Sequence, residues 1–185
     1  IDKQGNLVPK TVTEDSALPS IQINGATLHA EAFGDINNPI LIFLHGGPGG
    51  DYRPLISQIG QENASRYPNE RIATNGGLSQ LQNQYYCVFY DQRGAGLSER
   101  FDKDIIDFSM YVEDLKGIIN YYTQKKLNET GIEDDKVNIF AWSYGGILST
   151  GLINKYPDVY VLALGNYART LYVSKNFSVS FVFFF

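Results

Sequence analysis

Short runs that are apolar at every position, each followed by a turn of small residues, constrain the fold most strongly. The clearest is Ile40–Leu44, which leads directly into HGGPGG. A strand with one solvated face alternates apolar and polar residues, whereas a strand covered on both faces is apolar throughout. The run Tyr85–Tyr90 has the same character, and the segment KVNIFAW, residues 136–142, is largely apolar and predicts another strand. These runs predict a mostly parallel sheet with both faces covered.

The segments around these runs predict helices, a hairpin and a further strand. Apolar residues recur at helical spacing in two stretches, the first of which follows Ser109, a candidate helix cap. The positions are Tyr111, Leu115, Ile118 and Tyr122 in the first stretch, and Ile147, Gly151, Leu152 and Tyr156 in the second, which ends before Pro157. Alternating runs flank Asn24-Gly25 and predict a β-hairpin, and VYVLALG, residues 159–165, predicts another strand. We therefore expect an α/β fold in which a mostly parallel, twisted sheet with an N-terminal β-hairpin carries helices on both faces.

Length and composition favour one domain with a packed core. The chain has 185 residues, of which 43% are hydrophobic, and a formal net charge of −5. This charge disfavours nucleic acids and anionic membrane surfaces as partners. We divide the chain into a polar N-terminal tail at 1–20, expected on the surface, a core at 21–165 and an atypical C-terminal segment at 166–185. Residues 60–80 are expected to form a long surface connection or a short helix.

The segment AWSYGG predicts a nucleophilic serine. Ser143 ends an apolar strand and is followed at once by a predicted helix, so the chain must bend sharply there. Small residues two positions before and after, Ala141 and Gly145, let the strand and the helix approach closely, and Gly146 adds clearance. The N–H groups at the start of the helix favour a negative oxygen. The competing interpretation is that Ser143 only caps the helix.

The loop HGGPGG predicts an oxyanion-binding site. It follows the first buried strand and contains His45, Gly46, Gly47, Pro48, Gly49 and Gly50. A loop with so few side chains lets backbone N–H groups approach a substrate, as acyl transfer requires. A tight turn that binds nothing is the alternative. The third motif, DQRGAGLS at 91–98, has Glu99 where a dinucleotide loop has its last glycine, so we interpret it as a structural turn in which Asp91 and Arg93 bind neighbouring backbone.

Together, HGGPGG, DQRGAGLS and AWSYGG resemble the α/β-hydrolase superfamily, and within it the proline iminopeptidase-like branch. The resemblance extends from about Ile21 to Leu164. It implies that Ser143 is the nucleophile, that the N–H groups of Gly47 and Tyr144 form the oxyanion hole, and that the Gly47–Pro48 bond is cis. Ala141 replaces the usual glycine but is still small. Epoxide hydrolases and dehalogenases of the superfamily are disfavoured, because they carry aspartate at the position of the serine.

The motifs do not supply a complete catalytic triad. In this superfamily the acid and the histidine follow the serine along the chain. After Ser143 the sequence contains no histidine, and its one acid there, Asp158, lies where the family does not place its acid. Of the two histidines that precede the serine, His45 belongs to the glycine loop, and His29 is expected to face solvent or a polar neighbour.

Three interpretations follow. In the first, the chain is the N-terminal, inactive part of a serine hydrolase that cleaves peptides, as an iminopeptidase or aminopeptidase, or cleaves esters. In the second, it is a pseudo-hydrolase that binds a small molecule or a protein. In the third, it is an enzyme whose site is completed by residues of another copy of this chain or of a different chain.

Other functional classes receive little support from the sequence. We predict no metal or organic cofactor, no transmembrane segment, and a small molecule or short peptide as substrate. Cys87 is expected to be a small buried hydrophobic residue. The sequence leaves the location open between the cytoplasm and export, the latter if an N-terminal signal was removed before Ile1, and it leaves the oligomeric state open.

Overall fold

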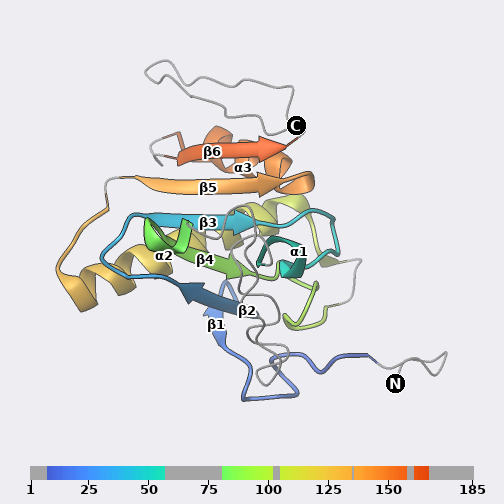
Figure 1. The fold of residues 1–185 in the computed structure, drawn as a ribbon. Coiled ribbons are helices and arrows are strands. Elements are labelled where there is room, and N and C mark those ends of the chain that lie inside the picture. Colours follow the sequence, from blue (N-terminus) through green and yellow to red (C-terminus); the bar gives the residue numbers. More distant parts are fainter. Residues whose placement is uncertain (1–7, 57–80, 102–104, 135, 158–160, 167–185) are drawn as a thin grey trace.

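The computed structural model of the chain describes residues 8–56, 81–101, 105–134, 136–157 and 161–166 (Figure 1). The predicted connection at 60–80, the acid Asp158 and the C-terminal segment after Asn166 lie outside these residues. The elements alternate between strands and helices along the chain. Their order is β1 (Ser20–Ile23), β2 (Ala26–Phe33), β3 (Ile40–Leu44), α1 (Arg53–Ile56), the short 3₁₀ helix η2 (Leu81–Asn83), β4 (Tyr86–Tyr90), α2 (Phe108–Thr130), β5 (Val137–Trp142), α3 (Tyr144–Lys155) and β6 (Val161–Asn166).

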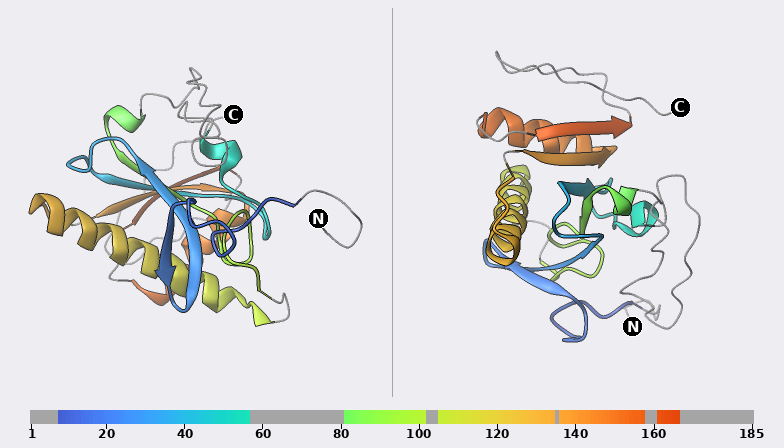
Figure 2. Two further views of the ribbon diagram at one scale, coloured as in Figure 1. Left: turned by 90° about the horizontal axis from the view of Figure 1, so that it is seen from below. Right: turned by 60° about the vertical axis from the view of Figure 1, so that its left-hand side comes forward.

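The strands form a six-stranded sheet in the order β1-β2-β4-β3-β5-β6. Strands β4, β3, β5 and β6 are parallel to one another, whereas β2 pairs with β1 and with β4 in the antiparallel sense. Figure 2 shows the twist of this sheet. The predicted fold class, a mostly parallel sheet with an N-terminal hairpin, is confirmed. The hairpin turns at Asn24 and Gly25, whose φ angles of 47° and 74° suit the turn that matches strand twist.

The two faces of the sheet are covered by different helices. Ile40, Ile42 and Leu44 of β3 pack in one hydrophobic cluster with residues of α2 and α3, among them Leu115 and Leu148. The alternate residues of β3 lie on the other face. There Leu41 and Phe43 pack with Phe89 of β4, with Tyr52, and with Leu55 of α1. Helices α2 and α3 on one side and α1 on the other therefore bury the apolar strand on both faces (Figure 2).

The helix positions predicted from the sequence need two corrections. Asp107, not Ser109, caps α2, because its side chain accepts a hydrogen bond from the N–H of Met110 at 2.9 Å. In α3, the predicted buried residue Ile147 is 60% exposed. The buried positions are Gly145, Leu148, Ser149 and Leu152. Because the helix begins directly at the elbow, Gly145 rather than Ile147 sets the face that meets the sheet.

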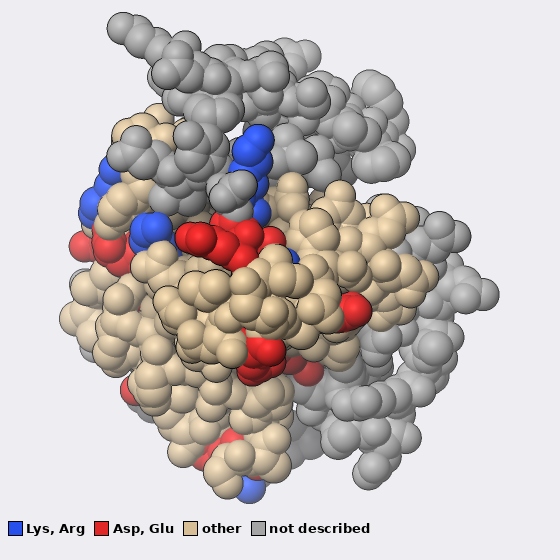
Figure 3. Space-filling view, turned by 90° about the vertical axis from the view of Figure 1, so that its left-hand side faces the viewer, with Lys and Arg blue, Asp and Glu red and all other residues tan. Residues whose placement is uncertain are grey.

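The N-terminal tail lies only in part on the surface. Thr11 and Val12 are buried, and the Val12 N–H donates to the carbonyl oxygen of Leu97 at 2.9 Å. The tail therefore packs against the DQRGAGLS turn. The surface carries mixed charges: on the face in Figure 3, the described acidic and basic side chains lie among uncharged residues and form no continuous basic area. None of the helices in the described part of the chain has the length and hydropathy needed to span a bilayer.

Candidate active site

The order of the strands brings the three motifs together. Strand β3 lies between β4 and β5, and all three are parallel. Their C-terminal ends therefore meet at the same edge of the sheet, where ligands bind in open α/β sheets. The HGGPGG loop follows β3, the DQRGAGLS turn follows β4, and Ser143 follows β5. The sheet thus collects at one edge motifs that are separated by about half of the chain.

Ser143 adopts a strained backbone conformation. Its φ is 52° and its ψ is −116°, in the region that favours glycine, at a cost of about 1–3 kcal/mol. The side chain is exposed, and it makes no capping hydrogen bond to the helix. The interpretation of Ser143 as a simple helix cap therefore loses its main support. What remains is an exposed hydroxyl on a sharp bend between β5 and α3.

The bend depends on close contact between α3 and β3. A Cβ atom placed on Gly145 would lie 2.7 Å from the carbonyl oxygen of Leu44, closer than packed atoms allow. The ring of Tyr144 packs edge-on against Phe108 and Tyr111 of α2, with centroids 6.3 and 6.1 Å away. Burial raises the pKa of the Tyr144 hydroxyl. Its N–H is the first of α3, and helix N-terminal N–H groups have no acceptor within the helix.

The glycine loop lies against the serine. A Cβ atom on Gly46 would be 3.2 Å from Cβ of Ser143 and 3.4 Å from Cδ1 of Trp142, so a side chain there would press on both. Gly47 has a φ of 142°, which a residue with a side chain rarely adopts. The Gly47–Pro48 bond is cis, as the resemblance implied. Trp142 is 42% exposed and flanks both the loop and the serine.

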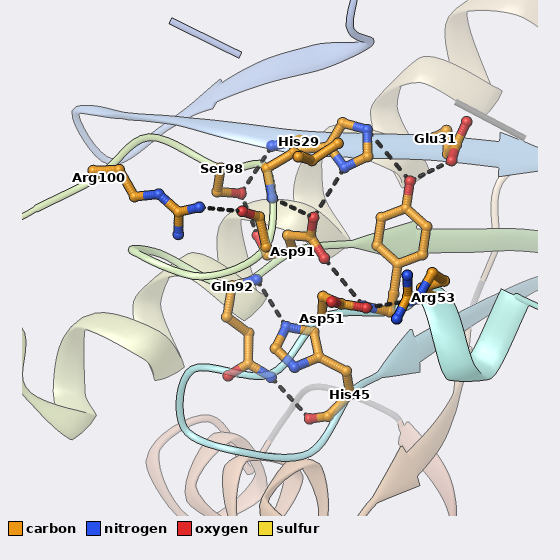
Figure 4. A network of polar contacts seen from close by, with 12 residues as sticks. His29, Glu31, His45, Asp51, Arg53, Asp91, Gln92, Ser98 and Arg100 are labelled. Carbon is orange, nitrogen blue, oxygen red and sulfur yellow. Dashed lines mark hydrogen bonds and ion pairs between the residues drawn. The ribbon is translucent and has the colours of Figure 1, made fainter. Parts of the chain in front are cut away.

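His45 is buried and binds Gln92 with both its ring and its backbone. The Gln92 N–H donates to His45 Nε2 at 3.0 Å, and the Gln92 side-chain amide donates to the His45 carbonyl oxygen at 3.0 Å. Because Nε2 accepts, the ring proton lies on Nδ1, which donates to the carbonyl oxygen of Gly46 at 2.7 Å. His45 therefore shapes the loop and ties it to the DQRGAGLS turn (Figure 4).

Asp91 is the centre of a buried polar network (Figure 4). Its Oδ1 accepts from the Tyr52 N–H at 3.0 Å, and its Oδ2 accepts from the Leu97 N–H at 2.7 Å and from His29 Nδ1 at 3.1 Å. The Ser98 hydroxyl donates to the Asp91 carbonyl oxygen at 2.6 Å and accepts from the His29 N–H at 2.9 Å. The prediction that Asp91 binds neighbouring backbone is confirmed, and His29 faces polar neighbours rather than solvent.

Arg93 of the same turn reaches a different part of the molecule. Its Nε and Nη2 donate to the two carboxylate oxygens of Asp114 in α2, each at 2.8 Å. Nη2 also donates to the carbonyl oxygen of Asn24 in the hairpin at 3.1 Å. Arg93 thus binds backbone, as predicted, and joins the turn to both the hairpin and α2.

Two residues of the network, Tyr52 and Glu31, were not singled out from the sequence. The Tyr52 ring stacks on His29, with centroids 5.2 Å apart and an interplanar angle of 10°. The Tyr52 hydroxyl donates to the Glu31 carboxylate and lies 3.4 Å from His29 Nε2. His29 and Glu31 are two residues apart in a strand and so share one side, which is the signal that the sequence offered. Tyr52 has no such signal, because only the folded loop brings it there.

The chain is similar to known aminopeptidases and to an iminopeptidase-related protein. The sequence model of the family described as "Serine aminopeptidase, S33" matches residues 79–168. A probable aminopeptidase of Bacillus subtilis, YbaC, is 27% identical over 169 residues, which cover 89% of this chain and 42% of that protein. The solved proline iminopeptidase-related protein of Thermus thermophilus has a TM-score of 0.58 at 21% identity, covering 80% of this chain and 43% of that one. The chain has the fold of the α/β-hydrolases. Its resemblance to the proline iminopeptidase-like branch is confirmed.

The superfamily contains other activities with the same fold. Epoxide hydrolase 1 of Caenorhabditis elegans is 23% identical over 173 residues, 89% of this chain and 36% of that protein. A solved epoxide hydrolase of Bacillus megaterium has a TM-score of 0.55 at 20% identity, covering 80% of this chain and 41% of that one. The chain therefore spans about two fifths of the length of the relatives it matches. Among the described residues, no group of three or more potential ligands could hold a metal ion.

Proposed function

We propose that this chain supplies the nucleophile and the oxyanion hole of a serine hydrolase that acts on peptides or esters. The observation that carries the proposal is the exposed hydroxyl of Ser143, on a strained bend at the start of α3 and directly beside the glycine loop. Strain of this kind persists where the surrounding structure enforces it, and it clusters at functional sites. A serine with only a structural role has no need of it.

The proposed chemistry is nucleophilic acyl transfer. Ser143 Oγ forms a bond to the carbonyl carbon of the substrate, while the carbonyl π electrons move onto the oxygen. The N–H groups of Gly47 and Tyr144 then donate to that negative oxygen, and each such donor lowers the barrier by about 3 kcal/mol. The remaining groups of the site, Gly46, Pro48, Gly49 and Gly146, give these amides room. The serine proton passes to a base, and the amine or alcohol leaves with a proton in return.

The base and its supporting acid are assigned to residues outside the three motifs. Each histidine of this chain has ring contacts in the polar network: His45 Nε2 accepts from Gln92, and His29 Nδ1 donates to Asp91. Both rings therefore support the loop and the turn. The proposal gives this chain the nucleophilic half of the reaction, and a complete enzyme needs a further histidine and acid.

Aminopeptidase activity is the first candidate for the complete protein. The matching family model and the B. subtilis relative are both described as aminopeptidases. Epoxide hydrolysis is less well supported, because this chain carries a serine rather than a carboxylate at the elbow. A serine alkoxide forms an acyl-enzyme that water hydrolyses readily, which suits peptide and ester substrates.

Site-resolved labelling with a fluorophosphonate tests the proposal. The reagent forms an O–P bond with a serine and releases fluoride, and it places negative charge on oxygen as acyl transfer does. Ser143 and Ser109 are both exposed, so Ser109 is an internal control. An oxyanion hole without a base still accelerates reaction about 10³-fold. We expect Ser143 to be labelled at least about 100-fold faster than Ser109, with a rate that follows hydroxide concentration. The Ser143→Ala variant should lose this label and keep the label at Ser109.

Two outcomes would contradict the proposal. Equal labelling of Ser143 and Ser109 would mean that no oxyanion hole serves the serine, which favours the binding-module interpretation. A rate that levels off near neutral pH would show a titrating base within this chain, and would overturn the assignment of the nucleophilic half alone.

A further inference from the structure

The glycine loop is held at both of its ends by two consecutive residues. It leaves β3 at His45 and reaches Tyr52 just before α1. Between these ends, Gly47, Pro48 and Gly49 are exposed. Glycine-rich segments have large conformational freedom, so the position of an amide within one depends on what fixes the segment. Gln92 contacts the first end and Asp91 the second.

At the first end, Gln92 makes two hydrogen bonds to one residue. Its N–H and its side-chain amide bind the ring and the carbonyl oxygen of His45, each at 3.0 Å. Gln92 is 1% exposed. Its Oε1, also buried, has no hydrogen-bond partner among the described residues. A buried amide oxygen without a partner lowers the stability of the fold, so an amide is unfavourable here unless its donor group is needed. We therefore assign the role of this side chain to its donor group.

At the second end, Asp91 binds the backbone at Tyr52, where the loop leads into α1. The distance from Asp91 Oδ1 to the Tyr52 nitrogen is 3.0 Å. The other carboxylate oxygen is fixed by Leu97 and His29, so the carboxylate cannot rotate without breaking several bonds. A Cβ atom on Gly96 would collide with this carboxylate, which shows how tightly the turn encloses it.

We propose that Asp91 and Gln92 are positioning residues that hold the two ends of the glycine loop and so fix the Gly47 N–H relative to Ser143. The inference rests on the proposed function and deepens it. The DQRGAGLS turn is then not only a structural connection after β4. Its residues Asp91 and Gln92 also hold the glycine loop in place.

A matched pair of variants tests the role of Gln92. Gln92→Met keeps the length of the side chain and the backbone bond to His45, but removes the donor to the His45 carbonyl oxygen. Asn138→Leu is the control, because Asn138 Nδ2 donates in the same way to the carbonyl oxygen of Ile40 at 3.0 Å, at the opposite end of β3. Displacement of a catalytic group by about 1 Å can cost up to 100-fold in rate. We expect Gln92→Met to reduce the Ser143-to-Ser109 labelling ratio about tenfold or more, and Asn138→Leu to leave it unchanged.

The NMR order parameter of the Gly47 N–H gives a readout that needs no chemistry. It should fall in Gln92→Met and in Asp91→Asn, and stay at the wild-type value in Asn138→Leu. Asp91→Asn is informative only if it folds. Gln92→Met replaces an amide whose oxygen is already unpartnered, so the role of Gln92 can be tested even if Asp91→Asn does not fold. Thermal unfolding of each variant separates loss of folding from loss of loop order.

The two proposals fail in different ways. Selective labelling of Ser143 that is equal in the wild type and Gln92→Met, with an unchanged Gly47 order parameter, would overturn the positioning role and leave the proposed function standing. Absence of selective labelling in the wild type would overturn the proposed function. The order parameter would still decide whether Gln92 holds the loop.

Discussion

At the scale of single residues, backbone strain and burial separate the reactive groups of this chain from the inert ones. Ser143 has a hydroxyl that is exposed and a backbone that is strained. Cys87 has a thiol that is chemically more nucleophilic but lies fully buried in β4. Burial raises the pKa of this thiol from 9.0 to about 12, so the thiolate does not form near neutral pH. Environment, and not side-chain chemistry alone, decides which of the two can react.

Replacement of Ser143 by glycine should stabilise the fold. Glycine adopts the φ of 52° without a steric penalty, so we expect the free energy of unfolding to rise by about 1 kcal/mol, measured by urea denaturation. The control is Asn120→Gly at an exposed position within α2, which should lower the stability by about 0.3 kcal/mol. A Ser143→Gly variant no more stable than the wild type would refute the strain at the elbow.

Cys87 should make stability depend on alkaline pH. The unfolded chain releases the thiol proton above about pH 9, whereas the folded chain keeps it until about pH 12. The stabilisation linked to this thiol is therefore complete below pH 9 and is lost as the pH rises towards 12. Urea unfolding at several pH values should show a steeper alkaline loss for the wild type than for Cys87→Ala. Parallel pH profiles of the two proteins would contradict this prediction.

At the scale of elements, the sequence predicts strands better than helix ends. The run Ile40–Leu44 coincides with β3, because residues that are apolar on both faces have one natural place, the middle of a covered sheet. Helix ends depend on which of several polar residues reaches a free N–H. Asp107 and Ser109 both suit a cap, and only the path of the chain before α2 decides between them. Helix α3 shows the same limit, because the elbow rotates the helix and turns Ile147 outward.

The cap of α2 can be tested directly. Asp107→Ala removes the acceptor of the Met110 N–H and should lower the free energy of unfolding by about 1 kcal/mol. Ser109→Ala should change it by less than about 0.5 kcal/mol, because the position is exposed. Urea denaturation measures both. A larger effect at Ser109 than at Asp107 would restore the cap predicted from the sequence.

The candidate site shows the same division between what the sequence does and does not reveal. Ser143, Gly47 and Tyr144 could be predicted as site residues because their motifs are contiguous in the chain. The polar network was not found as a network, because its members come from β2, the loop before α1, and the turn after β4. Contacts between segments that are distant in sequence have no local pattern. They depend on the order of the strands, which residue spacing alone does not fix.

At the scale of the whole molecule, a buried ion pair joins two parts of the fold. The Arg93 and Asp114 side chains are 8% and 2% exposed and join the turn after β4 to α2. Asp114, as a hydrogen-bond acceptor, raises the pKa of Arg93, which keeps the guanidinium charged. Such pairs place elements accurately, although a well-packed apolar pair can give similar stability.

A double-mutant cycle should reveal this coupling. Arg93→Met or Asp114→Leu alone leaves one buried charge without its partner and should cost about 3 kcal/mol or more. The double variant should lose clearly less than the sum of the single losses, as measured by urea denaturation. The exposed pair of Lys125 and Glu129 is the control, for which each single loss should stay below about 1 kcal/mol. Additive losses at Arg93 and Asp114 would contradict the coupling.

The place of Trp142 has a practical consequence. It is the chain's single tryptophan, and its partly exposed indole lies beside Gly46 and next to Ser143 in the chain. Because there is no other tryptophan, fluorescence excited selectively at the indole comes from this one side chain. It therefore reports on the immediate surroundings of the serine. Any compound that settles there should shift or quench that emission. The molecule thus carries its own optical sensor, and libraries of small compounds can be screened against it without an attached dye.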